Sequence, residues 1–129
     1  MIFTEAEIDY LNDQPLGRLA TLRADGTLQN NPVGFTYNPN LGTIDIGGHD
    51  LAASRKFRNI ADNGQVGFVV DDLLSRQPWR PRCLEIRGTG EALTSPTGEE
   101  PLIRIRPRRI ISFGIDPAGT GPGKRDVST

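Results

Sequence analysis

Three adjacent residues, Ser54, Arg55 and Lys56, offer the clearest chemistry in the chain, because they open the short amphipathic segment "SRKFRNIADN". The first backbone amides of a helix have no intrahelical acceptor, and the helix dipole makes that end electropositive. A hydroxyl group and two cations at the same end would complete a site for an anion such as a phosphate group. The alternative is an ordinary serine cap followed by two solvated cations, although cations at a helix N-terminus are electrostatically unfavourable.

A second candidate is the proline-flanked stretch "PWRPR", in which Trp79 stands with Arg80 and Arg82. A tryptophan can cover a flat ring, and arginine side chains can hold acidic groups. The alternative, which the residues favour equally, is a loop whose tryptophan covers the rim of a β-barrel or a contact between subunits.

His49 is the single histidine and Cys83 the single cysteine, so the sequence offers no protein-only metal cluster. Two glycines precede His49, which favours a histidine in a turn at the end of a strand. Contact with a cofactor is the alternative for this side chain. We therefore predict no metal site, and we identify no catalytic side chain.

The arginine-rich stretch "RIRPRR", residues 104–109, alternates with Ile103 and Ile105, which indicates the solvated face of an edge strand. The formal net charge of -1 creates no general attraction for nucleic acid. One tryptophan and two tyrosines provide few surfaces for base stacking. The stretch "GTGPGK" near the end lacks the first glycine and the Ser or Thr of a phosphate loop. A small nucleic-acid-binding β-barrel is thus the least favoured alternative, and we predict no nucleic-acid partner.

The composition indicates one soluble globular domain, with 129 residues of which 36% are hydrophobic and 24% charged. A single cysteine rules out an internal disulfide and indicates a reducing compartment. The first residues, "MIFTEAEIDY", are acidic and lack the apolar core of a signal peptide. No stretch approaches the ~20 apolar residues that a membrane span requires. We predict a cytoplasmic protein without a membrane partner.

Two short helices are predicted from their end signals. Thr4 and Glu7 have the spacing of a capping box, which predicts a helix over residues 5–11. The helix that begins at Ser54 should end at the Asn63-Gly64 pair, because glycine readily takes the left-handed conformation that terminates helices.

Six segments have the alternation or the short apolar runs of β-strands: residues 19–23, 28–37, 43–48, 65–70, 84–94 and 102–116. Pro32 marks an edge or a bulge, Pro107 should interrupt the last strand, and residues 75–82 should form a loop. This order predicts a mainly β fold, a six-stranded antiparallel barrel with short helices. The barrel domain should span residues 1–116, followed by a flexible Gly/Pro-rich tail, 117–129.

Four stretches in this order resemble one known family: "LGRLATLRADGTLQNNPVGF", "SRKFRNIADNGQVGFVVDD", "PWRPRCLEIRGTGEAL" and "IRIRPRRIISFGID". Together they are similar to the pyridoxamine 5′-phosphate oxidase-like split β-barrel family, especially its short members that use flavin mononucleotide (FMN) or the deazaflavin coenzyme F420. The resemblance covers residues 3–116 and implies a split barrel of the FMN-binding type.

The resemblance also assigns roles to residues. It implies that Ser54, Arg55 and Lys56 bind the phosphate of the cofactor, and that the strand carrying Asn31, Pro32 and Val33 faces the ring system. It further implies a homodimer with two cofactor sites at the interface, and a pocket lined by three residues of the proline-flanked stretch: Trp79, Arg80 and Arg82.

The chain departs from the longer pyridoxamine phosphate oxidases at its C-terminus, where a Gly/Pro-rich tail replaces the segment that grips the substrate phosphate. This difference favours the short reductase branch. The resulting hypothesis is an F420-dependent reductase that transfers a hydride to an unsaturated organic substrate. The alternative is an FMN-binding relative of the oxidases, including a non-catalytic flavin or cofactor carrier, and the residues do not separate FMN from F420.

Overall fold

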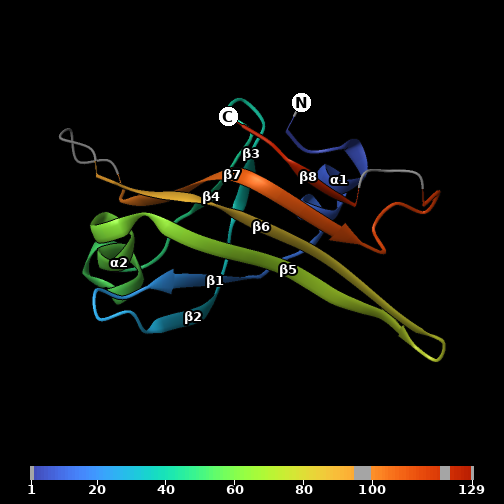
Figure 1. Ribbon diagram of the computed structural model, residues 1–129, viewed down its shortest axis with the longest axis horizontal. Helices are drawn as coiled ribbons and strands as arrows, with labels where there is room; N and C mark the ends of the chain where they lie inside the picture. Colours follow the sequence, from blue (N-terminus) through green and yellow to red (C-terminus); the bar gives the residue numbers. More distant parts are fainter. Residues whose placement is uncertain (1, 95–99, 120–122, 129) are drawn as a thin grey trace.

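The computed structural model describes residues 2–94, 100–119 and 123–128 (Figure 1). The described residues form two α-helices, one short 3-10 turn and eight strands. In chain order these are α1 (Glu5–Asp13), β1 (Gly17–Leu22), β2 (Leu28–Val33), β3 (Thr36–Asn38), β4 (Thr43–Ile46), η1 (Leu51–Ala53), α2 (Arg55–Asn63), β5 (Gln65–Arg76), β6 (Trp79–Leu93), β7 (Leu102–Phe113) and β8 (Lys124–Asp126). Neither described helix is long and apolar enough to cross a membrane.

All strands belong to one antiparallel sheet in the order β2-β1-β5-β6-β7-β4-β3, with β8 attached to β7. The edge strands β2 and β3 are consecutive in the chain, with only Gly34 and Phe35 between them. The sheet must therefore curl around its core until its two edges approach each other. Within the described ranges no hydrogen-bonded ladder joins these edges, so the sheet is curled but not closed.

The mainly β, antiparallel class is confirmed, whereas the expected number of six strands is wrong. The segment predicted as one strand over residues 28–37 divides into β2 and β3, because the chain turns at Gly34 from one edge of the sheet to the other. An eighth strand lies in the C-terminal tail, where we expected loose attachment. Residues Lys124–Asp126 pair there with β7, while the division of the chain at residue 116 stays a prediction.

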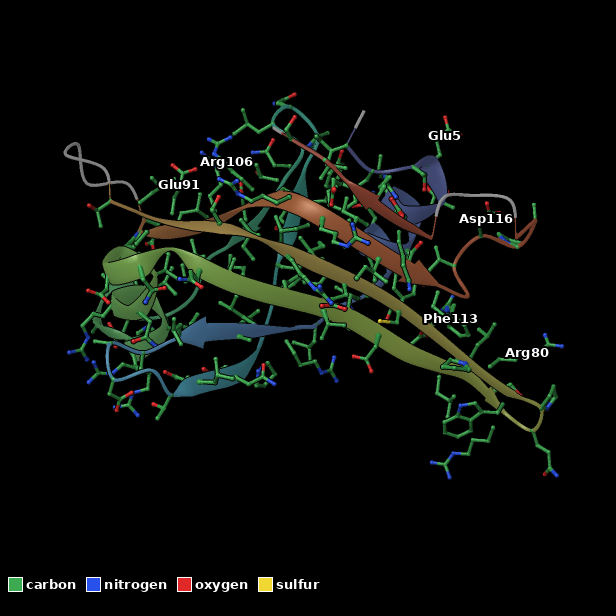
Figure 2. The ribbon with its side chains drawn as sticks, viewed as in Figure 1. Glu5, Arg80, Glu91, Arg106, Phe113 and Asp116 are labelled. Atoms are coloured by element: carbon green, nitrogen blue, oxygen red, sulfur yellow. The ribbon has the colours of Figure 1, made fainter. Side chains whose placement is uncertain are left out.

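The core lies on the concave side of the sheet, where alternate residues of each strand are buried. Fully buried side chains from five strands meet there: Leu19, Ile44, Phe68, Leu84, Ile86, Ile103, Ile105 and Ile110. β7 lies between β6 and β4, so the arginine-rich stretch is not an edge strand as expected. Two of its outward cations are paired instead: Arg104 binds Asp45, and Arg106 binds Glu91 (Figure 2).

The predicted break at Pro107 is a β-bulge within a continuous strand. Gly88 on β6 pairs with Pro107, whereas its neighbour Arg87 pairs with Arg109, so Arg108 is the extra residue. Gly88 accommodates this close approach, because a Cβ atom there would lie 2.3 Å from the carbonyl oxygen of Arg106.

Helix α1 begins as the sequence predicts and is held in place by the tail. The Thr4 hydroxyl accepts a hydrogen bond from the Glu7 amide at 3.2 Å, and the Glu7 carboxylate accepts one from the Thr4 amide at 2.9 Å. The Glu7 side chain is only 2% exposed and forms an ion pair with Arg125 of β8. Strand β8 therefore connects the N-terminal helix to β7, along the edge of β7 that β6 does not occupy.

The stretch predicted as a loop at residues 75–82 is instead the end of a long β-ribbon. β5 and β6 remain paired as far as Arg76 opposite Trp79, but β7 accompanies β6 only from Cys83 onward. The outer part of the hairpin is thus a two-stranded ribbon that projects beyond the sheet (Figure 1). Prolines are compatible with this strand because its outer edge has no neighbour to bond, which the proline-rich composition by itself does not reveal.

Candidate functional site

Ser54 caps helix α2, as its position in the sequence suggests. Its backbone is extended, and its hydroxyl accepts a hydrogen bond from the Phe57 amide at 3.3 Å. The same hydroxyl donates to the carbonyl oxygen of Leu51 at 2.6 Å. Both bonding directions of the hydroxyl are therefore used in shaping the entry to the helix.

The first turn of α2 carries positive charge that nothing in the described ranges neutralises. The side chains of Arg55 and Lys56 have no ion-pair partner there, their backbone amides have no acceptor, and the turn contains no acidic residue. The helix dipole adds to this charge. An anion at this end would meet two free amides and two cations, which fits a phosphate group.

Buried amide side chains attach α2 to strands β1 and β2. Asn59, 4% exposed, donates a hydrogen bond to the Thr21 hydroxyl at 3.0 Å and another to the Gln29 side-chain oxygen at 3.4 Å. Arg55 and Lys56 lie four and three residues before Asn59, so they share its stripe of the helix. The cationic first turn is therefore on the side of α2 that faces β1 and β2.

The β2 residues of the predicted site lie on this same side of the molecule. Gln29 donates from its side-chain nitrogen to the Asn31 side-chain oxygen at 2.8 Å. Val33 is buried in the core, whereas Pro32 is exposed, so the two point to opposite faces of the strand. β2 is an edge strand, which confirms one of the two positions predicted for Pro32.

The third group of predicted residues lies at the opposite end of the long axis, on the ribbon (Figure 1). Trp79 is 69% exposed, and Figure 2 shows Arg80 near the ribbon tip and Phe113 nearer the body of the sheet. A groove of about 550 Å³ lies between the ribbon and the end of β7. Its walls include Leu74, Trp79, Arg80, Arg82 and Phe113.

Arg82 is already engaged within the chain. Its guanidinium group donates two hydrogen bonds to the Asp72 carboxylate, at 2.9 and 2.6 Å, and lies 4.9 Å from the centre of the Tyr10 ring. The bond from Arg82 holds the pKa of Asp72 below its usual value, although burial opposes the shift. Burial and then the bond to Asp72 raise the pKa of Tyr10, so its hydroxyl keeps its proton. This cluster fixes the base of the ribbon to α1.

His49 is a turn residue, as favoured from the sequence. Its side chain is 96% exposed, and its Nε2 atom lies 3.1 Å from a carboxylate oxygen of Asp50. No group of three His, Cys, Asp or Glu side chains in the described ranges could hold a metal ion.

A comparison with protein families places the chain. The sequence profile described as pyridoxamine 5′-phosphate oxidase matches residues 3–128. The chain belongs to the pyridoxamine 5′-phosphate oxidase family. The resemblance stated from four motifs is thereby confirmed, and the match reaches past residue 116 into the tail.

Among curated proteins, the chain is similar to an enzyme from Streptomyces rimosus, the 5a,11a-dehydrotetracycline/5a,11a-dehydrooxytetracycline reductase. It is 46% identical over 137 aligned positions, which cover 99% of this chain and 95% of the reductase. Among solved structures, the fold is similar to that of a conserved hypothetical protein, Rv2991, from Mycobacterium tuberculosis. That match has a TM-score of 0.72 at 20% identity and covers 100% of this chain and 94% of the other.

A FAD-binding protein from Mycobacterium smegmatis is also similar, with a TM-score of 0.64 and 18% identity. The match covers 88% of this chain and 96% of that protein. At these identities the two structural likenesses show a shared fold.

Within this member of the family, the structure joins two of the three predicted residue groups. The α2 end and β2 are linked through Asn59, Gln29 and Thr21, none of which the sequence analysis singled out. A signal was available, because Asn59 lies between the buried Phe57 and Ile60. Likewise Thr21 occupies an inward position of β1 and is 2% exposed. The third group, on the ribbon, lies at the far end of the same chain.

Proposed function

We propose that this protein is an oxidoreductase that binds a phosphorylated flavin-type cofactor and transfers a hydride to an unsaturated organic substrate. We favour coenzyme F420, with FMN as the alternative. The observation that carries the proposal is the first turn of α2, where Arg55 and Lys56 have neither ion-pair partners nor acceptors for their amides in the described chain. The reductase relative, at 46% identity, supports the same class of reaction.

The proposed roles follow from the geometry. Arg55 and Lys56 would hold the phosphate with their side chains and amides. Ser54 would cap the helix through the Phe57 amide, which leaves the amides of Arg55 and Lys56 available to the phosphate. Asn31, Pro32 and Val33 lie on the edge strand that α2 contacts, so the ring system would rest against this strand. The bound cofactor would supply the hydride chemistry. The chain would bind and orient both reactants, and solvent would provide any proton.

We further propose a homodimer with cofactor sites at the interface. Trp79, Arg80 and Arg82 lie at the far end of the chain from α2, so they could line the same pocket only in a second copy. Two-stranded ribbons are marginally stable alone in water, and this one exposes Leu74 and Trp79. Exposed apolar clusters commonly mark contact surfaces, which supports a partner that covers this end.

The substrate that we propose is an unsaturated molecule with fused rings. The relative is named for reducing 5a,11a-dehydrotetracyclines, and the prefix denotes an unsaturated substrate. The exposed aromatic side chains Trp79 and Phe113 border the ribbon groove and would suit a flat, apolar ligand. With a single cysteine, Cys83, the chain suits a reducing compartment, and we propose that it acts in the cytoplasm.

A second candidate function is that of a non-catalytic FMN or cofactor carrier. The observation that favours it is that the hydrogen bonds between α2 and β2 in the described chain join only amide side chains and one hydroxyl group, with no carboxylate, histidine or cysteine among them. Turnover of the reduced cofactor with an electron-poor acceptor would separate an enzyme from a carrier.

The experiment that tests the proposal is titration of F420 and of FMN into the wild type and into the double variant Arg55→Ala/Lys56→Ala. Each charge-assisted bond is worth roughly 1.5–3 kcal/mol, so we expect cofactor affinity to fall about a hundredfold or more. Arg58→Ala is the matched control, because Arg58 is an exposed cation of the same helix that bonds the Ala53 carbonyl. Equal affinity in the double variant and the wild type would overturn the anchor assignment.

A further inference from the structure

A line of hydrogen bonds runs from the middle of α2 to the ring-facing strand β2. Asn59 donates to Thr21 and to Gln29, and Gln29 donates to Asn31. Thr21 and Gln29 are directly opposite each other in the β1–β2 ladder, so the line crosses two strands. It ends on a residue of the proposed ring site and begins on the helix stripe that carries the proposed phosphate site.

The fold does not require this line to attach α2. Phe57 and Ile60 bury the apolar face of the helix, and Asn63 donates to the Leu22 carbonyl oxygen at 2.7 Å. The end of the helix is fixed by the Gly64 carbonyl oxygen, which accepts from the Gly90 amide at 2.8 Å. These contacts reach β1 and β6. In the described chain, Asn59 is the one residue of α2 whose side chain bonds β2.

A buried polar residue is an expensive way to pack a helix, because its amide must be removed from water. An apolar side chain would fill the same position without that penalty. What directional hydrogen bonds add is a defined spacing and orientation between the parts that they join. Here the joined parts are α2 and the edge strand β2, which otherwise has a neighbouring strand on one side only.

We infer that Asn59 and Gln29 are positioning residues that set the spacing between the anion-binding end of α2 and the ring-facing strand β2. The inference rests on the proposed function. A cofactor that carries a phosphate and a flat ring makes two attachments, and the second is favourable only when the two subsites have the spacing of the ligand. The hydrogen-bonded line would hold them at that spacing before the ligand arrives.

This role makes a prediction that differs from a purely structural one. Loss of the line should weaken binding of the intact cofactor while leaving each half of it unaffected. The halves are inorganic phosphate and the phosphate-free ring compound with its ribityl side chain, which is riboflavin for FMN and the corresponding deazaflavin for F420. Each occupies one subsite and does not depend on the spacing.

The test uses Gln29→Met and Asn59→Ala in the full-length protein. Gln29 is only partly buried on an edge strand, so Gln29→Met keeps the side-chain volume and tests the idea even if Asn59→Ala does not fold. We expect about tenfold weaker binding of the intact cofactor in both variants. The phosphate-free ring compound and inorganic phosphate, each measured by displacement of the intact cofactor, should keep dissociation constants within about twofold of the wild type.

Asn63→Ala is the matched control, because it removes amide bonds of the same helix stripe to Leu22 of β1 and to Gln65 of β5 but none to β2. It should lower thermal stability without changing the ratio of intact-cofactor affinity to the affinity for the phosphate-free ring compound. An unchanged ratio in Gln29→Met overturns the inference, as does a parallel loss for all three ligands. A wild type that binds neither cofactor overturns the proposed function itself, whereas cofactor binding that depends on Lys56 but not on Gln29 overturns only the positioning role.

Discussion

The two ends of the molecule are incomplete in opposite ways. At the α2 end the apolar face of the helix is buried and the polar amides are bonded to one another, but the cations Arg55 and Lys56 have no counter-charge in the described chain. At the ribbon end the cation Arg82 is fully paired with Asp72, but large apolar side chains face solvent. One end therefore lacks an anion, and the other lacks an apolar cover.

This difference indicates which kind of ligand would bind favourably at each end. Charge without a partner is relieved by a small anionic group, which a helix end can hold with few contacts. Exposed apolar area is relieved only by a surface of comparable size, such as a flat ligand or a second protein chain. A homodimer that carries an anionic ring cofactor would complete both ends at once.

The largest effect is expected at the ribbon end, where Arg82→Ala would leave the Asp72 carboxylate without its guanidinium partner. The two side chains are 23% and 27% exposed, so solvent replaces only part of the lost bonding. We expect a loss of roughly 2 kcal/mol in the free energy of unfolding, measured by urea denaturation at fixed protein concentration. Arg80→Ala is the control, because Arg80 is exposed and has no ion pair in the described chain.

The dependence of this loss on pH identifies its source. The pKa of Asp72 is lowered in the folded protein, so the pair stabilises the fold above the unfolded pKa of about 4. That stability disappears as the pH falls through the lower, folded pKa. The difference between wild type and Arg82→Ala should therefore be complete at neutral pH and shrink in acid. A difference of the same size in both conditions would contradict the assignment to this ion pair.

An effect of similar size is expected when the apolar cover is tested. Trp79→Ala should raise the dissociation constant of the dimer about thirtyfold, because buried tryptophans at interfaces commonly contribute about 2 kcal/mol or more. Sedimentation over a range of concentrations would measure it. Leu41→Ala provides the control, since Leu41 is 42% exposed but lies in the turn between β3 and β4, outside both proposed contact regions. A monomeric wild type, or an equal effect of both variants, would contradict the proposal that a second chain covers the ribbon end.

The smallest effect concerns the unpartnered charge. Arg55→Glu places an acidic residue in the first turn of α2, where the helix dipole favours it, so the cofactor-free protein should gain roughly 0.5 kcal/mol in stability. The gain should shrink in about 1 M salt, where screening is strong. Arg58→Glu, further along the helix, is the comparison variant. A protein that becomes less stable on Arg55→Glu would show that Arg55 is not a destabilising charge.

Local patterns in the sequence were sufficient for several features of this protein. Three such features lie where predicted: the capping box at Thr4 and Glu7, the end of α2 at Gly64, and the inward alternation of Ile103 and Ile105. Each depends on residues within a few positions of one another, and local sterics and hydrogen bonding decide such features. The family could also be identified from the sequence, because its members share short motifs in a fixed order.

Tertiary structure decided the features that depend on distant residues. The line of hydrogen bonds from Asn59 to Asn31 joins a helix to strands some thirty positions earlier. Arg125 forms an ion pair with Glu7, which lies almost the whole length of the chain away in the sequence. The proline-rich segment forms a two-stranded ribbon because β7 does not extend beside it. The prolines, which lack an N–H group, therefore leave no hydrogen bond to a third strand unmade. Partners at such separations are selected by the curvature of the whole sheet, and no local pattern carries that information.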